Sequence, residues 1–325
     1  MFGKMMDRFY YGKSGKGDYT KDDLPETRWQ LFWEMLKIRA AGLCRLNVLY
    51  ALAWLPALAV VAMAVTRGYS ALAGMAELQE TAAQGAISAE ALAEGMAQFS
   101  AWIRGLVLQT LLLLIPCIAV TGPFTAGIAL ITRNWARDEH AFVWSDYRDA
   151  VKENWKQGLA VSSITAVMPL MLYVCWTFYG EMAQENLLFL LPQVLSSTLV
   201  LVWLCSLLYQ YPLMVSYRLR LRDLLRNGVL LTLGRMPMTA GLKLLTLIPG
   251  AIAAAVAFFT PYLPYALLVL LLYYVMIGFA LSRFIGASYA NAVFDRFINA
   301  KLEGVQVNRG LYQDDEDEQS DEGEE

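Results

Sequence analysis

The chain has 325 residues, enough for about two soluble domains of roughly 100–200 residues each. Hydrophobic residues make up 57% of it and charged residues only 17%, whereas soluble domains average about 45–50% and about 25%. That balance, together with long apolar runs and only four cysteines, excludes soluble, disordered, collagen-like and disulfide-scaffold proteins. The composition predicts an all-α, integral membrane helix bundle.

Residues 1–44 are predicted to form a cytoplasmic N-terminal segment. From Trp29 to Ile38, large apolar side chains stand among the charged residues Glu34 and Lys37, a pattern that favours a helix lying in the membrane interface. A cytoplasmic helix packed on the bundle explains the same pattern equally well.

The membrane domain is predicted at residues 45–302. A helix rises about 1.5 Å per residue, so it needs about 20 apolar residues to cross a core about 30 Å thick. Five stretches without Asp, Glu, Lys or Arg reach this length: Leu46–Thr66, Gly105–Thr132, Gln157–Gly180, Asn186–Tyr217 and Leu244–Ser282. The last stretch has 39 residues and contains Pro261 and Pro264, which interrupt helices. Splitting it there gives six spans.

The basic residues predict the orientation of these spans. Of the 26 Lys and Arg residues, 24 lie before the first span, in residues 133–156, in residues 218–243, or from Arg283 onward. Only Arg67 and Arg104 lie in the alternate loops. Because basic loops stay in the cytoplasm, we expect a multi-pass protein with both termini inside.

Two segments outside the spans have their own composition. The outer loop 67–103 is rich in alanine and is divided by Gly85 into two short predicted helices, Ser70–Gln84 and Ser88–Trp102, the second with Ser88 as its N-cap. We expect it to cover the outer ends of the spans; a ligand lid is the alternative.

The C-terminal segment 303–325 is acidic. Nine of the 29 acids lie in its last twelve residues, so outside them the 26 bases outnumber the acids, although the whole chain has a net charge of −3. Such a charge density favours disorder. The tail is either a solvated end or a tether for a basic cytoplasmic partner. Nucleic-acid binding is not expected, because the bases interleave with the spans.

The spans offer little chemistry. No acid lies in the interior of a span, which argues against a proton-relay pump and an aspartyl protease. The lone His140 and the four cysteines lack the spacing of a metal site, so we expect no catalytic residue, cofactor or metal. Gln193, Ser197 and Gln210 fall on one face of the fourth span. Hydrogen bonds between helices are their default role; a site for a hydroxyl-rich solute is the alternative.

A weak repetition also runs through the spans. The first, third and fifth spans each contain a central proline: Pro56, Pro169 and Pro249. The second and fourth spans end on Gly122-Pro123 and Tyr211-Pro212, each followed by basic residues and an amphipathic stretch. Three repeated hairpins are one interpretation, although the sixth span lacks a matching proline.

Residues 133–156 are predicted to form a cytoplasmic elbow. Pro123 would bend the chain before it, and Trp135, Trp144 and Trp155 would anchor it against lipid headgroups. The elbow and its approach contain a distinctive set of residues: Gly122, Pro123, Arg133, Trp135, Trp144, Asp146, Asn154 and Gln157. From Pro116 to Gly158 this pattern resembles the YesL-like family, domain of unknown function 624, although Tyr147 stands where the family commonly has Phe. Leu46–Tyr50 and Leu55-Pro56 are similar to the first span of that family.

The resemblance implies a plasma-membrane protein of a Gram-positive bacterium, without assigned activity, that accompanies ATP-driven sugar-uptake systems. The leading hypothesis is therefore a non-enzymatic accessory or regulatory component of a solute uptake system, by analogy for carbohydrate. The elbow and the acidic tail would face an ATP-driven transporter or another membrane protein, and membrane lipid would be the other partner. The alternatives are a permease for a neutral polar solute, using Gln193, Ser197 and Gln210, and a structural membrane protein.

Overall fold

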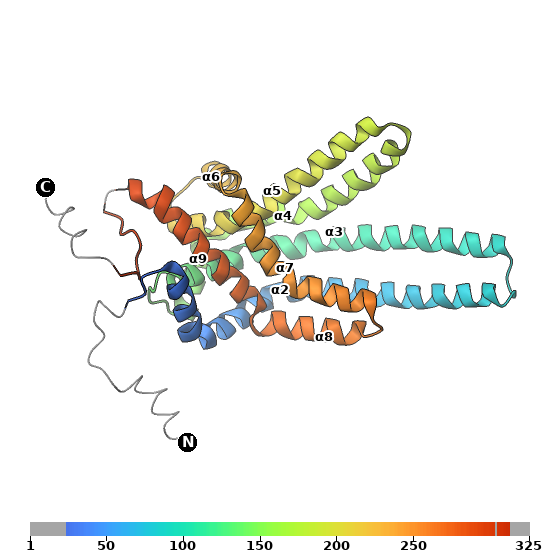
Figure 1. Ribbon diagram of the computed structural model, residues 1–325, viewed down its shortest axis with the longest axis horizontal. Helices are drawn as coiled ribbons and strands as arrows, with labels where there is room; N and C mark the ends of the chain where they lie inside the picture. Colours follow the sequence, from blue (N-terminus) through green and yellow to red (C-terminus); the bar gives the residue numbers. More distant parts are fainter. Residues whose placement is uncertain (1–23, 303, 313–325) are drawn as a thin grey trace, which may run out of the picture.

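The computed structural model describes residues 24–302 and 304–312. The predicted acidic tail beyond residue 312 lies outside the described residues. Within the described part all regular structure is helical (Figure 1). The elements in chain order are α2 (Arg28–Ala83), α3 (Ala89–Trp135), α4 (Val143–Glu185), η2 (Leu187–Phe189), α5 (Leu190–Ser216), α6 (Leu221–Gly234), α7 (Met236–Phe259), α8 (Leu263–Tyr273), the π-helical turn η3 (Tyr274–Gly278), α9 (Phe279–Phe297) and η4 (Asn299–Lys301).

The prediction of six spans is confirmed. Six helical stretches of the described chain are long and apolar enough to cross a membrane. The fifth and sixth stretches are separated at Pro261 and Pro264, as predicted. α7 ends at Phe259, and α8 begins at Leu263 with Pro264 in its first turn. The amphipathic stretch expected after the fourth span is α6.

The first three helices are much longer than their spans. α2 has 56 residues, α3 has 47 and α4 has 43. The two short helices expected in the outer loop are not separate: the first is the end of α2 and the second is the start of α3. Alanine has the highest helix propensity, so this alanine-rich sequence continues each helix beyond its span. The turn falls where expected: Gly85 has φ +74° and Ser88 caps α3. Figure 1 shows this end of the hairpin extending away from the other helices, so it does not cover their outer ends.

The segment Trp29–Ile38 is likewise not a separate helix but the start of α2. Thr27 and Gln30 form a capping box that fixes this start. One face of the segment packs on the bundle, with Leu31 buried and the Phe32 ring stacked on Phe284 of α9 at 5.4 Å between centroids. The opposite face exposes Trp29. The start of α2 thus matches the alternative of a helix packed on the bundle.

Burial is concentrated at one end of the bundle, which we call the base. The base comprises the start of α2, the end of α3, the start of α4, the end of α5, α6 and α9. No residue of α2 after Ala57 is buried, and none of α3 before Thr121. Beyond the base the α4–α5 hairpin points away from the α2–α3 hairpin, whereas α8 runs in the same direction as α2 (Figure 1). Their apolar side chains are exposed, as expected for helices that meet lipid rather than one another.

A buried asparagine joins the first span to the last. The Asn47 side-chain amide donates to the carbonyl oxygens of Tyr274 and Val275 at 2.8 and 2.7 Å, and its oxygen accepts from the Ala280 amide at 2.8 Å. These are backbone groups of the π-helical turn and of the first residues of α9. Asn47 therefore supplies partners where the regular helical pattern of hydrogen bonds shifts.

Replacing Asn47→Leu is expected to lower stability, because it strands buried backbone groups at about 1–3 kcal/mol each. The thermal unfolding midpoint of the purified protein in mild detergent measures this. Gln109→Leu is the matched control, because Gln109 is exposed on α3. Equal midpoints for the two variants would contradict the role of Asn47.

Candidate functional site

Helices α3 and α4 approach one another most closely at two glycines. A Cβ atom on Gly122 would lie 2.0 Å from the Gly158 carbonyl oxygen, which is far inside van der Waals contact. A Cβ atom on Gly158 would lie 2.9 Å from the Gly122 backbone. Small residues of this kind let membrane helices pack backbone against backbone, so Gly122 belongs to the contact that sets the geometry of the α3–α4 pair.

Pro123, beside this contact, lacks the amide that would bond to the Ala119 carbonyl one turn earlier. The hydroxyl of Ser162 on α4 donates to that carbonyl instead. The proline therefore creates an acceptor that the neighbouring helix fills. Every backbone group inside a bilayer needs such a partner.

The predicted elbow is a short turn followed by the first turns of α4. Trp135 is buried, with its ring against Gly42 of α2, so the expectation that it anchors the elbow at lipid headgroups is wrong. Its neighbours Trp144 and Trp155 are 65% and 50% exposed. The three tryptophans therefore divide into one core residue and two surface residues.

The polar residues of the elbow each have a local structural role. The Asp146 carboxylate accepts from the Phe142 amide at 2.9 Å, at the start of α4. The Asn154 side chain donates to the Ala150 carbonyl at 3.0 Å within the same helix. The Gln157 side chain reaches further and donates to the Leu219 carbonyl at 2.8 Å, which ties α4 to the segment between α5 and α6.

The comparison with protein families matches a stretch that contains most of α3 and α4. Residues 101–176 match the model of a family described as protein of unknown function, DUF624. The chain contains a DUF624 domain. The match includes the residues from Pro116 to Gly158 that carried the resemblance, whereas Leu46–Tyr50 and Leu55-Pro56 lie outside it. No curated protein and no solved structure matches the chain.

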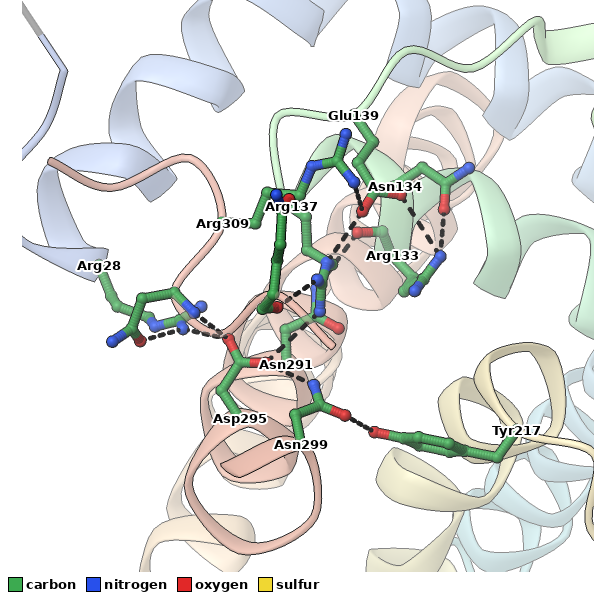
Figure 2. Close-up of polar contacts among 12 residues, drawn as sticks. Arg28, Arg133, Asn134, Arg137, Glu139, Tyr217, Asn291, Asp295, Asn299 and Arg309 are labelled. Carbon is green, nitrogen blue, oxygen red and sulfur yellow. Dashed lines mark hydrogen bonds and ion pairs between the residues drawn. The ribbon is translucent and has the colours of Figure 1, made fainter. Parts of the chain in front are cut away.

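At the base, the DUF624 domain meets the rest of the chain in a cluster of charges around Asp295 (Figure 2). The Asp295 side chain is only 2% exposed. One carboxylate oxygen accepts from the Arg28 guanidinium and from the Asn308 amide, the latter at 3.2 Å. The other accepts from Arg137 at 3.4 Å and from the Asn299 side chain. The donors come from the start of α2, from the turn after α3, from η4 and from the end of the described chain.

A second carboxylate extends the cluster. Glu139 accepts from Arg137 at 3.0 Å and pairs with Arg133 at 3.4 Å and Arg309 at 3.5 Å. Arg133, one of the signature residues, therefore faces this cluster. Arg137 bridges the two acids.

The cluster continues to the end of α5. The Tyr217 hydroxyl donates to the Asn299 side chain at 2.6 Å. Burial, with the nearby negative charge of Asp295, raises the pKa of Tyr217 to about 12, so it remains a donor at neutral pH. A cavity of about 160 Å³ lies beside these groups and is lined by Arg133, Arg137, Tyr217, Asn291 and Asn299 among others.

The structure does not bring the three polar residues of the fourth span together. Gln193 and Gln210 are 17 positions apart on α5, which places them about 25 Å apart along the helix. Gln193 donates weakly to the Trp176 carbonyl at 3.5 Å, and Ser197 donates to the Gln193 carbonyl of its own helix. Gln210, in the base, donates to Ser206 at 2.7 Å.

Sequence reasoning missed Asp295, Arg28 and Arg137 as a site. A usable signal was present at one of them, because Asp295 follows Val293-Phe294 and precedes Phe297, an acid among apolar neighbours. The sequence does not indicate which arginines pair with this acid, because Arg137 lies 158 positions and Arg28 lies 267 positions from Asp295.

Asp295→Asn is expected to destabilise the base by about 3–5 kcal/mol, because in a buried place it leaves Arg28 without its carboxylate and removes one of the two acids that pair with Arg137. Thermal unfolding in detergent and limited proteolysis of the α3–α4 turn measure the effect. Asp149→Asn, at an exposed position of α4, is the control and should unfold like the wild type. If both variants unfold alike, the cluster does not hold the base together.

Proposed function

We propose that this protein is a non-enzymatic component of a bacterial plasma membrane, with both termini in the cytoplasm, that assists or regulates a solute uptake system. Carbohydrate is the solute class suggested by the family resemblance. In this proposal the base lies in the cytoplasm and at the inner membrane surface, and the hairpins cross the bilayer.

One observation carries the proposal: a tightly packed base joined to membrane hairpins that scarcely bury against one another. None of the residues in the most apolar 18-residue stretch of α3 is buried. Membrane helices that lack mutual packing expose their sides to lipid or to the helices of another protein. Such a chain is suited to dock beside a partner rather than to enclose a path of its own.

The base also presents aromatic side chains outward. Phe142 and Trp144, at the start of α4, are 66% and 65% exposed. Exposed aromatic residues are typical of the anchoring positions of protein interfaces. In the proposed orientation they face the cytoplasmic side, where a transporter has its ATP-driven parts.

The state of the buried acid supports a role without catalysis. Each oxygen of the Asp295 carboxylate already accepts from two donors. A general base needs a free lone pair within reach of a substrate proton. The wide separation of Gln193 and Gln210 likewise makes a permease acting alone the less favoured alternative.

Crosslinking in native membranes, followed by purification of the tagged full-length chain, tests the proposed partner. We expect a membrane subunit of an ATP-driven uptake transporter to be enriched, and Trp144→Ala to reduce that enrichment by about fivefold or more, since interface anchors carry most of the binding energy. Trp102→Ala, at a 44% exposed position on α3 far from the base, is the control and should retain the partner. Transport of a labelled sugar by proteoliposomes that contain this chain alone would instead support the permease.

The orientation has its own test. In a cysteine-free background, Ala86→Cys at the α2–α3 turn and Lys152→Cys near the base, both exposed positions, report opposite ends of the bundle. A membrane-impermeant maleimide applied to intact cells should label the first and spare the second, with both labelled after lysis. Labelling of the Lys152 position on intact cells would reverse the proposed orientation.

A further inference from the structure

A second cavity of about 160 Å³ lies where α5, α7 and α9 meet α2 and α3. Two cations line it, Lys243 from α7 and Arg283 from α9. No Asp or Glu is among its lining residues in the described chain. The other residues that line the cavity are aromatic, hydroxyl-bearing or apolar, for example Tyr211, Thr246 and Leu242.

These two cations differ from the arginines of the charged cluster around Asp295 and Glu139. Arg28, Arg133, Arg137 and Arg309 all pair with Asp295 or Glu139. No ion pair joins Lys243 or Arg283 to a carboxylate in the described part of the chain. Arg283 instead lies over the ring of Tyr211, at 5.4 Å from its centroid. Such a contact holds the guanidinium in place and leaves its N–H groups, which lie in the plane of the guanidinium, available to a ligand.

The cavity lies at the ends of predicted spans. Lys243 directly precedes the charge-free stretch Leu244–Ser282, and Arg283 directly follows it. Because the ends of spans lie at the membrane interface, we expect the cavity to lie near the phosphates of lipid headgroups.

The threonine and serine hydroxyl groups in the wall are already engaged as donors. Thr246 donates to the Lys243 carbonyl at 2.8 Å, and Ser282 donates to the Gly278 carbonyl at 2.8 Å. The cavity wall therefore offers a ligand the charged N–H groups of Lys243 and Arg283, and the Trp54 indole N–H, also in the wall, is buried without a partner in the described chain. A planar guanidinium fork and a compact ammonium together suit a tetrahedral oxyanion.

We propose that this cavity binds a phosphate group between Lys243 and Arg283, carried by an anionic lipid headgroup or free in solution. Basic pockets between membrane helices are a known way to hold lipid phosphates. The volume is sufficient, since a protein cavity of about 150 Å³ accommodates benzene. The site goes beyond the proposed role in uptake and does not depend on it.

The test uses the full-length chain purified in neutral detergent, with binding followed by native mass spectrometry and by the thermal unfolding midpoint. Phosphatidylglycerol is the lipid probe, diacylglycerol the lipid without phosphate, and inorganic phosphate the free anion. We expect phosphatidylglycerol to bind and raise the midpoint, and diacylglycerol to do neither. If inorganic phosphate also binds and displaces the lipid, the site accepts the free anion; if only the lipid binds, the headgroup is the natural ligand.

Lys243→Gln combined with Arg283→Gln should weaken this binding by about tenfold or more, because both charged contacts to phosphate are lost. The charge-preserving pair Lys243→Arg and Arg283→Lys should retain binding within about threefold, since both positive charges remain. Arg148→Gln combined with Lys301→Gln removes two exposed charges elsewhere and is the matched control. If the double glutamine variant does not fold, the single variant Lys243→Gln, which keeps the Arg283 contact with Tyr211, takes its place.

Equal affinity of the wild type and of a folded glutamine variant for phosphatidylglycerol would overturn the proposal. So would equal binding of diacylglycerol, because that result would assign the affinity to the acyl chains alone.

Discussion

The pairing of one buried carboxylate holds the base together. Asp295 draws in Arg28 from before the first span, Arg137 from after the second, and Asn308 from beyond the last. Membrane helices gain nothing from hydrophobic association, since lipid is as apolar as their own side chains. The direction of each hairpin is therefore set where the chain leaves the base, and a polar cluster outside the apolar spans governs the arrangement of the spans.

The spans themselves could be predicted because the bilayer imposes a length and a composition that can be counted. The same holds for the break at Pro261 and Pro264 and for the cap at Ser88. The full lengths of α2 and α3 could not be predicted, since hydropathy reports where a helix is in lipid and not where it ends. Outside the lipid, alanine-rich sequence continues a helix until a glycine such as Gly85 turns the chain.

Polar sites in the interior were harder to find, for a different reason. Periodicity shows that Gln193 and Gln210 share a face of a helix but says nothing about the distance between them or about what packs there. Asn47 was one polar residue among many in the spans, and its value comes from the shifted backbone of η3, 227 positions later. Contacts between residues so far apart in sequence leave no local pattern in a single chain.

The family match likewise covers only part of what forms the polar sites. The DUF624 domain contributes most of α3 and most of α4, including the glycine contact and the carbonyl that Ser162 satisfies. Asp295 and the two cations of the cavity, however, lie outside residues 101–176, and the domain reaches Asp295 only through Arg137. The domain supplies Ala129 and Thr132 to one wall of that cavity. What binds there is decided by α7 and α9.

The distribution of charge joins these features. Four arginines in the base share two acids, which leaves the cluster positive even after pairing. Lys243 and Arg283, nearer the apolar hairpins, have no acid among the described residues that line their cavity. Basic residues near the ends of spans set the orientation of a membrane protein, and for that purpose exposed lysines suffice. A cavity that holds Lys243 and Arg283, with Arg283 stacked on Tyr211, fixes the direction in which their N–H groups point. An anion of the surrounding membrane is the group that would accept from those donors.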